Sequence, residues 1–124
     1  MPPKKTLFAD PDAILLGIYH GNIAWAADLQ EELDAAIRQR NYFTGVVRAN
    51  LADAAAGFVT YDLELFSGRS DLTESHKQIW RREVRRLESE GIVERAVRLI
   101  RLTDDGRARV TQLLEDQDVQ TKSN

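Results

Sequence analysis

Arginine is the side chain with the clearest capacity for binding chemistry in this sequence, and it is concentrated in the second half. Residues 76–109 hold ten Lys or Arg against six Asp or Glu, a net charge of +4. Residues 6–75 hold four Lys or Arg against eleven Asp or Glu, a net charge of −7. The whole chain has a formal charge of −3. Because guanidinium groups pair with phosphates and base edges, this asymmetry favours a polyanionic partner such as nucleic acid.

The cations fall on one face of a helix predicted over residues 72–90. Residues 71–74 have the spacing of a capping box, with Asp71 as the cap, and Gly91 follows as a stop signal. At about 100° per residue, one side of this helix carries His76, Trp80, Glu83, Val84 and Leu87. The opposite side carries Gln78, Arg81, Arg82, Arg85 and Ser89. This second side is the candidate binding face.

A second interpretation gives the arginines no ligand. On a solvated helix face they could form ion pairs with neighbouring glutamates, and such pairs are common and contribute little to stability. These pairs would join Arg81, Arg82, Arg85 and Arg86 with Glu83, Glu88 and Glu90. Nucleic-acid binding is favoured over this alternative because the rest of the chain is acidic.

The sequence offers little for catalysis or metal binding. It has no cysteine, and its two histidines are His20 and His76. No Gly-rich phosphate loop, nucleophile elbow or catalytic-triad spacing is visible. His76 lies on the apolar side of its helix, which is typical of a residue at the edge of the core. We therefore expect no enzyme activity, no cofactor and no metal site.

Length and composition are typical of one soluble globular domain. The chain has 124 residues, of which 43% are hydrophobic and 30% charged. The absence of cysteine fits a reducing compartment, so we expect a cytoplasmic protein. Lys4 and Lys5 before an apolar run could indicate a signal peptide, but Asp10 and Asp12 interrupt that pattern. No stretch approaches the length of a membrane span, so no membrane partner is expected.

The first half of the chain predicts helices. Residues 1–9 are expected to form a flexible arm, and residues 117–124 a polar tail. Between them, we expect a helix over 10–20 that ends at Gly21 and a second helix over 23–40.

A third helix, over residues 42–56 and ended by Gly57, carries only small side chains on one face. This face consists of Gly45, Ala49, Ala52 and Ala56. Small residues permit close approach of another helix, so we predict a homodimer interface here. A two-fold dimer would also double the number of phosphate contacts. The alternative is an alanine-rich surface helix.

Strands are predicted in two later segments. Residues 58–66 alternate apolar and polar side chains, which fits a half-buried strand or a short strand that runs into a helical turn. A second apolar run begins at Ile92, and residues 97–102 form a short β-type segment. Thr103 is expected to cap a last helix that ends at about residue 116.

Two phrases of the second half resemble a known family. They are WxxxVxxLExxGIVER at residues 80–95 and IRLTDDGR at 100–107. Their order and content resemble the winged helix-turn-helix transcriptional regulators, above all the MarR and PadR groups, over residues 72 to about 115. The resemblance implies a mainly α fold with a small β-sheet, a winged helix-turn-helix with additional N-terminal helices. In one domain over 10–116, residues 10–57 would form the helical dimerisation part and 58–116 the winged-helix part.

The resemblance also implies a DNA-binding transcriptional regulator, with the helix at 72–90 in a major groove of double-stranded DNA. The candidate DNA contacts are Thr73, Ser75, Lys77, Gln78, Arg81, Arg82, Arg85 and Arg95. The alternative function is a winged-helix adaptor for protein–protein interaction without DNA binding. A short wing, with three residues between Val93 and Val97, and the net negative charge favour that alternative.

A similar order of helix, glycine and strand occurs earlier, over residues 46–62. The helix at 43–56 is therefore a second candidate for the recognition helix. Its outward face offers Arg48 beside Asp53 and otherwise small residues, which makes it a poor phosphate binder.

Overall fold

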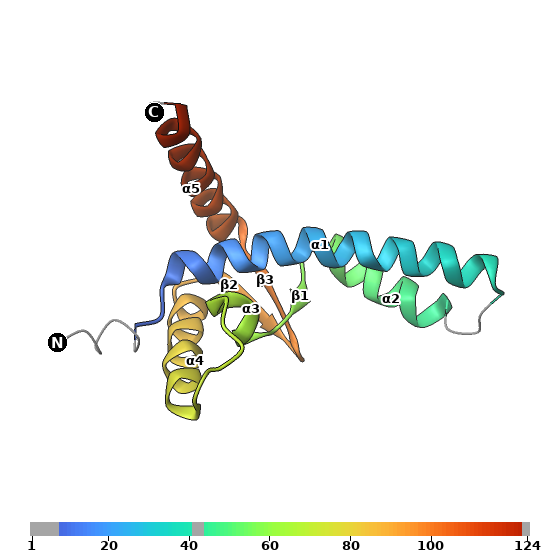
Figure 1. Cartoon of the computed structure of the whole chain (residues 1–124), viewed down its shortest axis with the longest axis horizontal. Helices are drawn as coiled ribbons and strands as arrows, with labels where there is room; N and C mark the ends of the chain where they lie inside the picture. The colour runs from blue at the N-terminus through green and yellow to red at the C-terminus, as the bar shows by residue number, and fades with distance from the viewer. Residues whose placement is uncertain (1–7, 41–43, 123–124) are drawn as a thin grey trace.

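The computed structural model describes residues 8–40 and 44–122, and in this part of the chain helices surround one small antiparallel sheet (Figure 1). The elements in order are α1 Pro11–Arg38, α2 Thr44–Ala55, β1 Val59–Thr60, α3 Leu63–Ser67, α4 Glu74–Ser89, β2 Val93–Ala96, β3 Leu99–Leu102 and α5 Asp104–Lys122. The predicted mainly α fold with a small β-sheet is confirmed. Most of the predicted arm at 1–9 and the start of the helix predicted at 42 lie outside the described residues.

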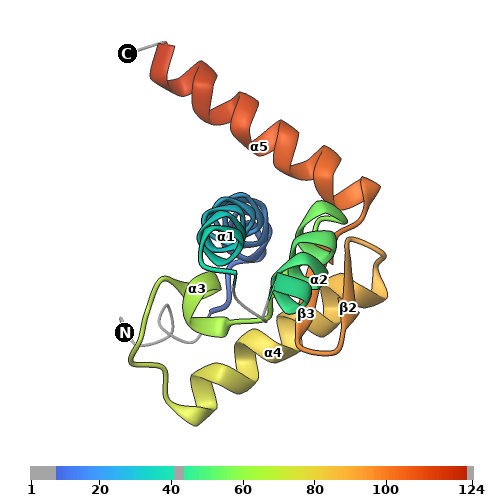
Figure 2. The same cartoon turned by 90° about the vertical axis from the view of Figure 1, so that its right-hand side faces the viewer.

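The long helix α1 forms the axis of the molecule, and the other elements are arranged along it (Figure 1). α2 lies against its C-terminal half, while α3, α4 and the sheet lie under its N-terminal half. α5 projects away on the other side of α1, as Figure 2 also shows. α5 runs to Lys122, beyond the predicted end at about residue 116.

α1 is one continuous helix, so the prediction of two helices separated at Gly21 is wrong. Gly21 is buried in the middle of α1. A Cβ atom at Gly21 would lie 2.9 Å from Leu65 Cδ2, and one at Gly17 would lie 3.0 Å from Phe66 Cδ1. These two glycines, four residues apart on one face, let α3 lie directly on α1. Packing therefore outweighs the low helix propensity of glycine at these positions.

Asn22 joins α1 to the end of α2. Its Nδ2 donates hydrogen bonds to the carbonyl oxygens of Ala54 and Phe58, both at 2.8 Å. Beyond this residue, α1 and α2 pack on each other through a small apolar cluster of their own. The buried members of that cluster are Leu29, Val47 and Ala54.

The sheet has the strand order β1-β3-β2, with both neighbouring pairs antiparallel. Val59 pairs with Ile100 across β1 and β3, and Val93 pairs with Leu102 across β2 and β3. The segment predicted as a strand or a strand with a helical turn takes the second form, since β1 is followed by α3. Val97 was expected in a strand but lies in the two-residue connection between β2 and β3, where Arg98 has a φ of 62°.

α4 begins at Glu74, two residues later than predicted, and its cap is Thr73 instead of Asp71. The Thr73 hydroxyl accepts the N–H of His76 at 3.2 Å. Asp71 lies two residues before this cap and forms a two-point ion pair with Arg69, 3.0 Å from Nε to Oδ1. The predicted end is confirmed, because Gly91 follows the helix with a φ of 75°.

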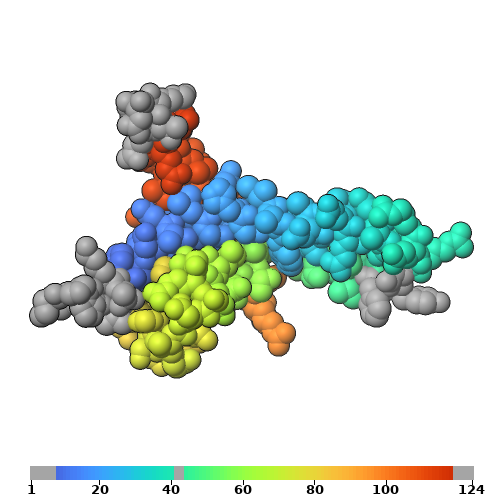
Figure 3. Space-filling model, in the orientation of Figure 1, coloured from blue at the N-terminus to red at the C-terminus, as the bar shows by residue number. Residues whose placement is uncertain are grey.

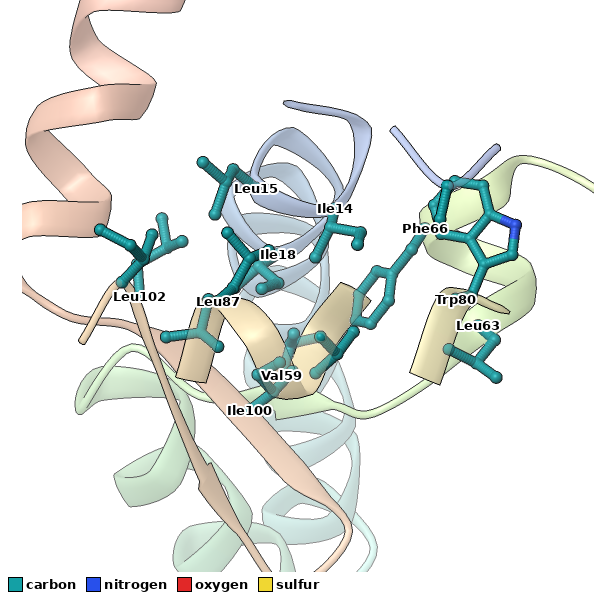
Figure 4. Close-up of a cluster of buried hydrophobic side chains, with 14 of the residues drawn as sticks. Ile14, Leu15, Ile18, Val59, Leu63, Phe66, Trp80, Leu87, Ile100 and Leu102 are labelled. Carbon is teal, nitrogen blue, oxygen red and sulfur yellow. The ribbon is translucent and has the colours of Figure 1, made fainter. Parts of the chain in front are cut away.

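The main core lies between α1, α4 and the sheet (Figure 4). Its fully buried members include Ile14, Leu15, Ile18, Val84, Leu87, Ile100 and Val110. Trp80 is 8% exposed and packs in the same cluster, so the predicted buried side of α4 is confirmed. His76 is half-buried at the core edge, where its Nδ1 has no hydrogen-bond partner among the residues that the structure describes.

The LTDDG phrase at residues 102–106 fixes the start of α5. The Thr103 hydroxyl is 2.6 Å from the Gly91 carbonyl oxygen and accepts the N–H of Gly106 at 3.2 Å. A Cβ atom at Gly106 would overlap the carbonyl oxygen of Ile92. A residue without a side chain is therefore required where α5 crosses the end of α4.

Candidate nucleic-acid interface

The rotation of α4 about its own axis is set by its buried side. Trp80, Val84 and Leu87 are held in the core, which turns the opposite side to solvent. Gln78, Arg82 and Arg85 are exposed there. The N-terminal end of α4 and the β2–β3 connection point to the same side of the molecule, away from α5 (Figures 1 and 3).

Some of the arginines of α4 are paired within the chain. Arg86 contacts both Glu83 and Glu90, and these carboxylates raise its pKa. Arg81 forms an ion pair with Glu74, 3.1 Å from Nη1 to Oε1. The solvated-helix interpretation therefore describes Arg86, although Arg81 pairs with a different glutamate from those expected.

Arg82 and Arg85 form no ion pair with another residue in the described part of the chain. Both side chains are exposed, whereas Arg86 and Arg81 are held by carboxylates. Two guanidinium groups on one exposed helix face are thus free to meet an external anion.

The polar side of α4 consists of two parallel rows. Lys77, Arg81 and Arg85 are spaced four residues apart and form an inner row, next to the buried side. Lys77 and Arg81 are partly buried in this row. Gln78 and Arg82 form an outer row, which is fully exposed. Side chains four residues apart lie above one another on a helix, so each row is continuous.

Arg95, predicted to contact DNA, is turned toward the protein. Its guanidinium carbon lies 3.8 Å from the ring centroid of Tyr61, a cation–π contact. Its Nε also donates to the Leu99 carbonyl oxygen at 3.4 Å. Arg95 therefore positions Tyr61 and is less available to an external ligand than Arg82.

Tyr61 is a candidate site residue that the sequence did not indicate. It ends the β1 segment, where its backbone N–H donates to the Arg98 carbonyl oxygen at 2.9 Å. Burial raises the pKa of the Tyr61 phenol, while the charges of Arg95, Arg81 and Arg85 act in the opposite direction. The alternation of apolar and polar residues around Val59 had predicted Tyr61 in a strand. No sequence pattern near Tyr61 indicates that α4 places cations beside it.

A surface hollow of about 240 Å³ lies where β1, α3 and α4 meet. It is lined by Tyr61, Asp62, Leu63, Glu64, Lys77 and Arg81. The Asp62 carboxylate accepts the backbone N–H groups of Glu64 and Leu65, so it is used as the cap of α3. The hollow thus offers an ammonium group, a guanidinium group and a phenol beside two carboxylates, those of Asp62 and Glu64.

The remaining predicted DNA contacts, Thr73 and Ser75, are exposed at the N-terminal end of α4. The Thr73 hydroxyl is already used as the helix cap. At the β2–β3 connection, Val97 is 87% exposed and Arg98 is exposed beside it. Arg101 is held on the body by Glu94 and by a hydrogen bond of 3.2 Å to the Ala56 carbonyl oxygen.

The predicted dimer-interface residues lie on one side of α2 and, for Ala56, in the turn that follows it. Gly45, Ala49, Ala52 and Ala56 are all exposed. A Cβ atom at Gly45 would have no atom of the described chain within 4 Å. The opposite face of α2 carries Val47 and Ala54 and packs on α1.

No protein-family model, curated protein or solved structure matches the chain. Among residues 8–40 and 44–122, no group of three or more His, Cys, Asp or Glu side chains is placed to hold a metal ion. No helix in the same ranges is long and apolar enough to cross a bilayer.

Proposed function

We propose that this protein is a winged helix-turn-helix regulator of transcription that binds duplex DNA through α4. The observation that carries the proposal is the outward face of α4, where Arg82 and Arg85 are exposed and unpaired within the described residues beside Gln78. Arginine and glutamine are side chains that can hydrogen-bond to base edges in a major groove.

The order of the elements supports the same proposal. In a winged helix, a short helix and a recognition helix are followed by a two-stranded hairpin, and α3, α4, β2 and β3 have this order. β1 completes the sheet by pairing with β3. The GIVER and LTDDG phrases, on which the resemblance rests, occupy the end of α4 and the start of α5.

We also propose that the protein acts in the cytoplasm as a homodimer. One α4 helix offers few unpaired cations, and a two-fold axis would present a second copy to the next turn of the same groove, about 34 Å away. The exposed small-residue face of α2 is the proposed contact between the two copies, because it permits close approach of helices.

Binding to a random-sequence duplex at several salt concentrations tests the DNA proposal. The logarithm of the affinity should fall linearly with the logarithm of salt, by about 0.9 for each phosphate neutralised. Arg85→Ala should weaken binding and reduce this slope, with thermal stability within about 0.5 kcal/mol of the parent, because the side chain is exposed.

Arg48→Ala is the matched control, because Arg48 is exposed on α2, away from α4. It should leave both affinity and slope unchanged. Absence of binding at low salt would contradict the proposal, and so would equal effects of the two substitutions.

A second candidate function is a winged-helix adaptor that binds another protein. The observation that favours it is Val97, an apolar side chain 87% exposed at the tip of a two-residue connection. A protein that does not bind DNA at low salt, but whose Val97→Ser variant loses a protein partner, would support this candidate instead.

A further inference from the structure

The ring of Tyr61 is fixed from two sides. Arg95 covers one face at 3.8 Å, and Phe66 meets the ring edge-on with centroids 5.8 Å apart. The Tyr61 hydroxyl has no hydrogen-bond partner among the described residues and is not enclosed. Tyr61, held by these two contacts, lines the hollow between α3 and α4.

Several cations lie around this phenol. Lys77 and Arg81 of the inner row line the same hollow. Arg85 and Arg95 are close enough for their charges to favour the ionised phenol. The carboxylates of Asp62 and Glu64 line the same hollow, and Arg81 is paired with the carboxylate of Glu74. Around the phenol, the cations Lys77, Arg81, Arg85 and Arg95 therefore outnumber these three carboxylates by one.

We propose that Tyr61, Lys77 and Arg81 form a subsite for a phosphodiester group of the DNA backbone, with Arg95 as the residue that positions Tyr61. This inference rests on the proposed DNA-binding function. A phosphate is the ligand that fits, because it has several acceptor oxygens and a negative charge and needs no donor of its own.

The location of the subsite also fits a phosphate more closely than a base. Lys77 and Arg81 are partly buried beside the buried side of α4, so they are recessed relative to Gln78, Arg82 and Arg85, which are exposed. A helix in a major groove directs its most exposed row at the bases, and its flanks meet the phosphates that border the groove. Under this proposal Lys77 and Arg81 meet a phosphate, while the exposed side chains of Gln78, Arg82 and Arg85 face the bases.

Removal of one hydroxyl tests the subsite. Tyr61→Phe should weaken binding to random-sequence duplexes roughly tenfold, as expected for one hydrogen bond to a charged group. Its salt slope should be unchanged because the phenol is neutral, whereas Lys77→Gln and Arg81→Gln should each reduce the slope by about 0.9. Tyr19→Phe is the matched control, because Tyr19 is a partly buried tyrosine on α1, outside this hollow.

A second test uses a substitution that should increase DNA affinity. Its result could not be explained by partial unfolding of the variant. Glu64 lines the hollow and has no ion pair within the described residues, so its carboxylate should repel a bound phosphate. Glu64→Gln should therefore raise DNA affinity several-fold. Glu31→Gln, an equal charge change at an exposed position of α1, should have a much smaller effect.

The outcomes separate the subsite from the proposed function. If the parent protein does not bind duplex DNA, the DNA proposal and the subsite both fail. If the parent binds, but Tyr61→Phe and Glu64→Gln behave like their controls, the subsite alone is wrong.

The same subsite could instead bind free phosphate. Calorimetric titration with inorganic phosphate distinguishes this ligand from a phosphodiester group of DNA. Binding of free phosphate that is lost in Tyr61→Phe, with DNA affinity unchanged, would overturn the assignment to the DNA backbone.

Discussion

The helices α4 and α2 both end at a glycine in the left-handed region, yet they relate to the rest of the chain in opposite ways. α4 buries Trp80, Val84 and Leu87, and its other side carries charged and amide groups. α2 buries only Val47 and Ala54, and its other side carries glycine and alanine. α4 is thus a firmly oriented helix with a polar face, and α2 is a lightly held helix with an uncovered apolar face.

This difference indicates two kinds of partner. A cationic helix face is well solvated in water, and it can bind a nucleic acid by neutralising phosphates and releasing the counterions condensed on them. A face of small apolar side chains has no charged group to attract a polyanion. It permits a second helix to approach closely. Under the proposed function, α4 would bind DNA and α2 would bind a second copy of the chain, and the following predictions test that division.

The largest expected effect is a loss of protein stability on substitution of the buried side chains of α4. Trp80→Ala and Leu87→Ala should each lower the free energy of unfolding by about 2 to 5 kcal/mol, because each leaves a cavity in the main core. Val47→Ala on α2 should cost about 1 to 2.5 kcal/mol, because a smaller side chain is removed. Urea unfolding of each variant measures the difference.

Arg82→Ala is the surface control on the same helix, with an expected change within about 0.5 kcal/mol. If it destabilised the protein as much as Leu87→Ala, α4 would have to be rotated from its observed position.

The parts of the fold that the sequence predicted correctly depend on local patterns. The buried side of α4 follows from large apolar side chains at helical spacing, and its end follows from the conformation of Gly91. The continuity of α1 could not be predicted in this way. Gly21 is a stop signal in isolation, and only its contact with Leu65 explains why the helix continues.

The candidate site divides in the same manner. The exposed face of α4, with Arg82 and Arg85, was visible from periodicity. Tyr61 was missed because its neighbours Arg81 and Arg95 come from α4 and β2, elements that only the tertiary fold brings to it. The cap at Thr73 was missed because Asp71 and Thr73 are both capping residue types, and the sequence pattern alone did not distinguish them.

The next effect is on assembly. If the proposed dimer forms, Ala52→Arg should convert it into monomers and abolish the proposed tight DNA binding, although it adds a cation. A long charged side chain cannot fit in a close contact between helices. Ala108→Arg on α5, also exposed, is the control and should remain dimeric. Sedimentation of the parent and both variants at micromolar concentration measures which of them are dimers. A parent that is already monomeric would exclude the dimer, and dissociation by Ala108→Arg alone would place the interface on α5.

The smallest expected effect is at Gly45, where stability and assembly should change in opposite directions. Gly45 is in the first turn of α2, and a Cβ atom there meets no atom of the described chain. In dilute solution, where the monomer predominates, Gly45→Ala should raise the free energy of unfolding by about 0.4 to 1 kcal/mol, because alanine restricts the unfolded chain. If α2 packs on its copy through Gly45, the added methyl group should also weaken the dimer, which concentration-dependent sedimentation would detect. A stabilised monomer with an unchanged dimer constant would remove Gly45 from the interface, leaving the face to Ala49, Ala52 and Ala56.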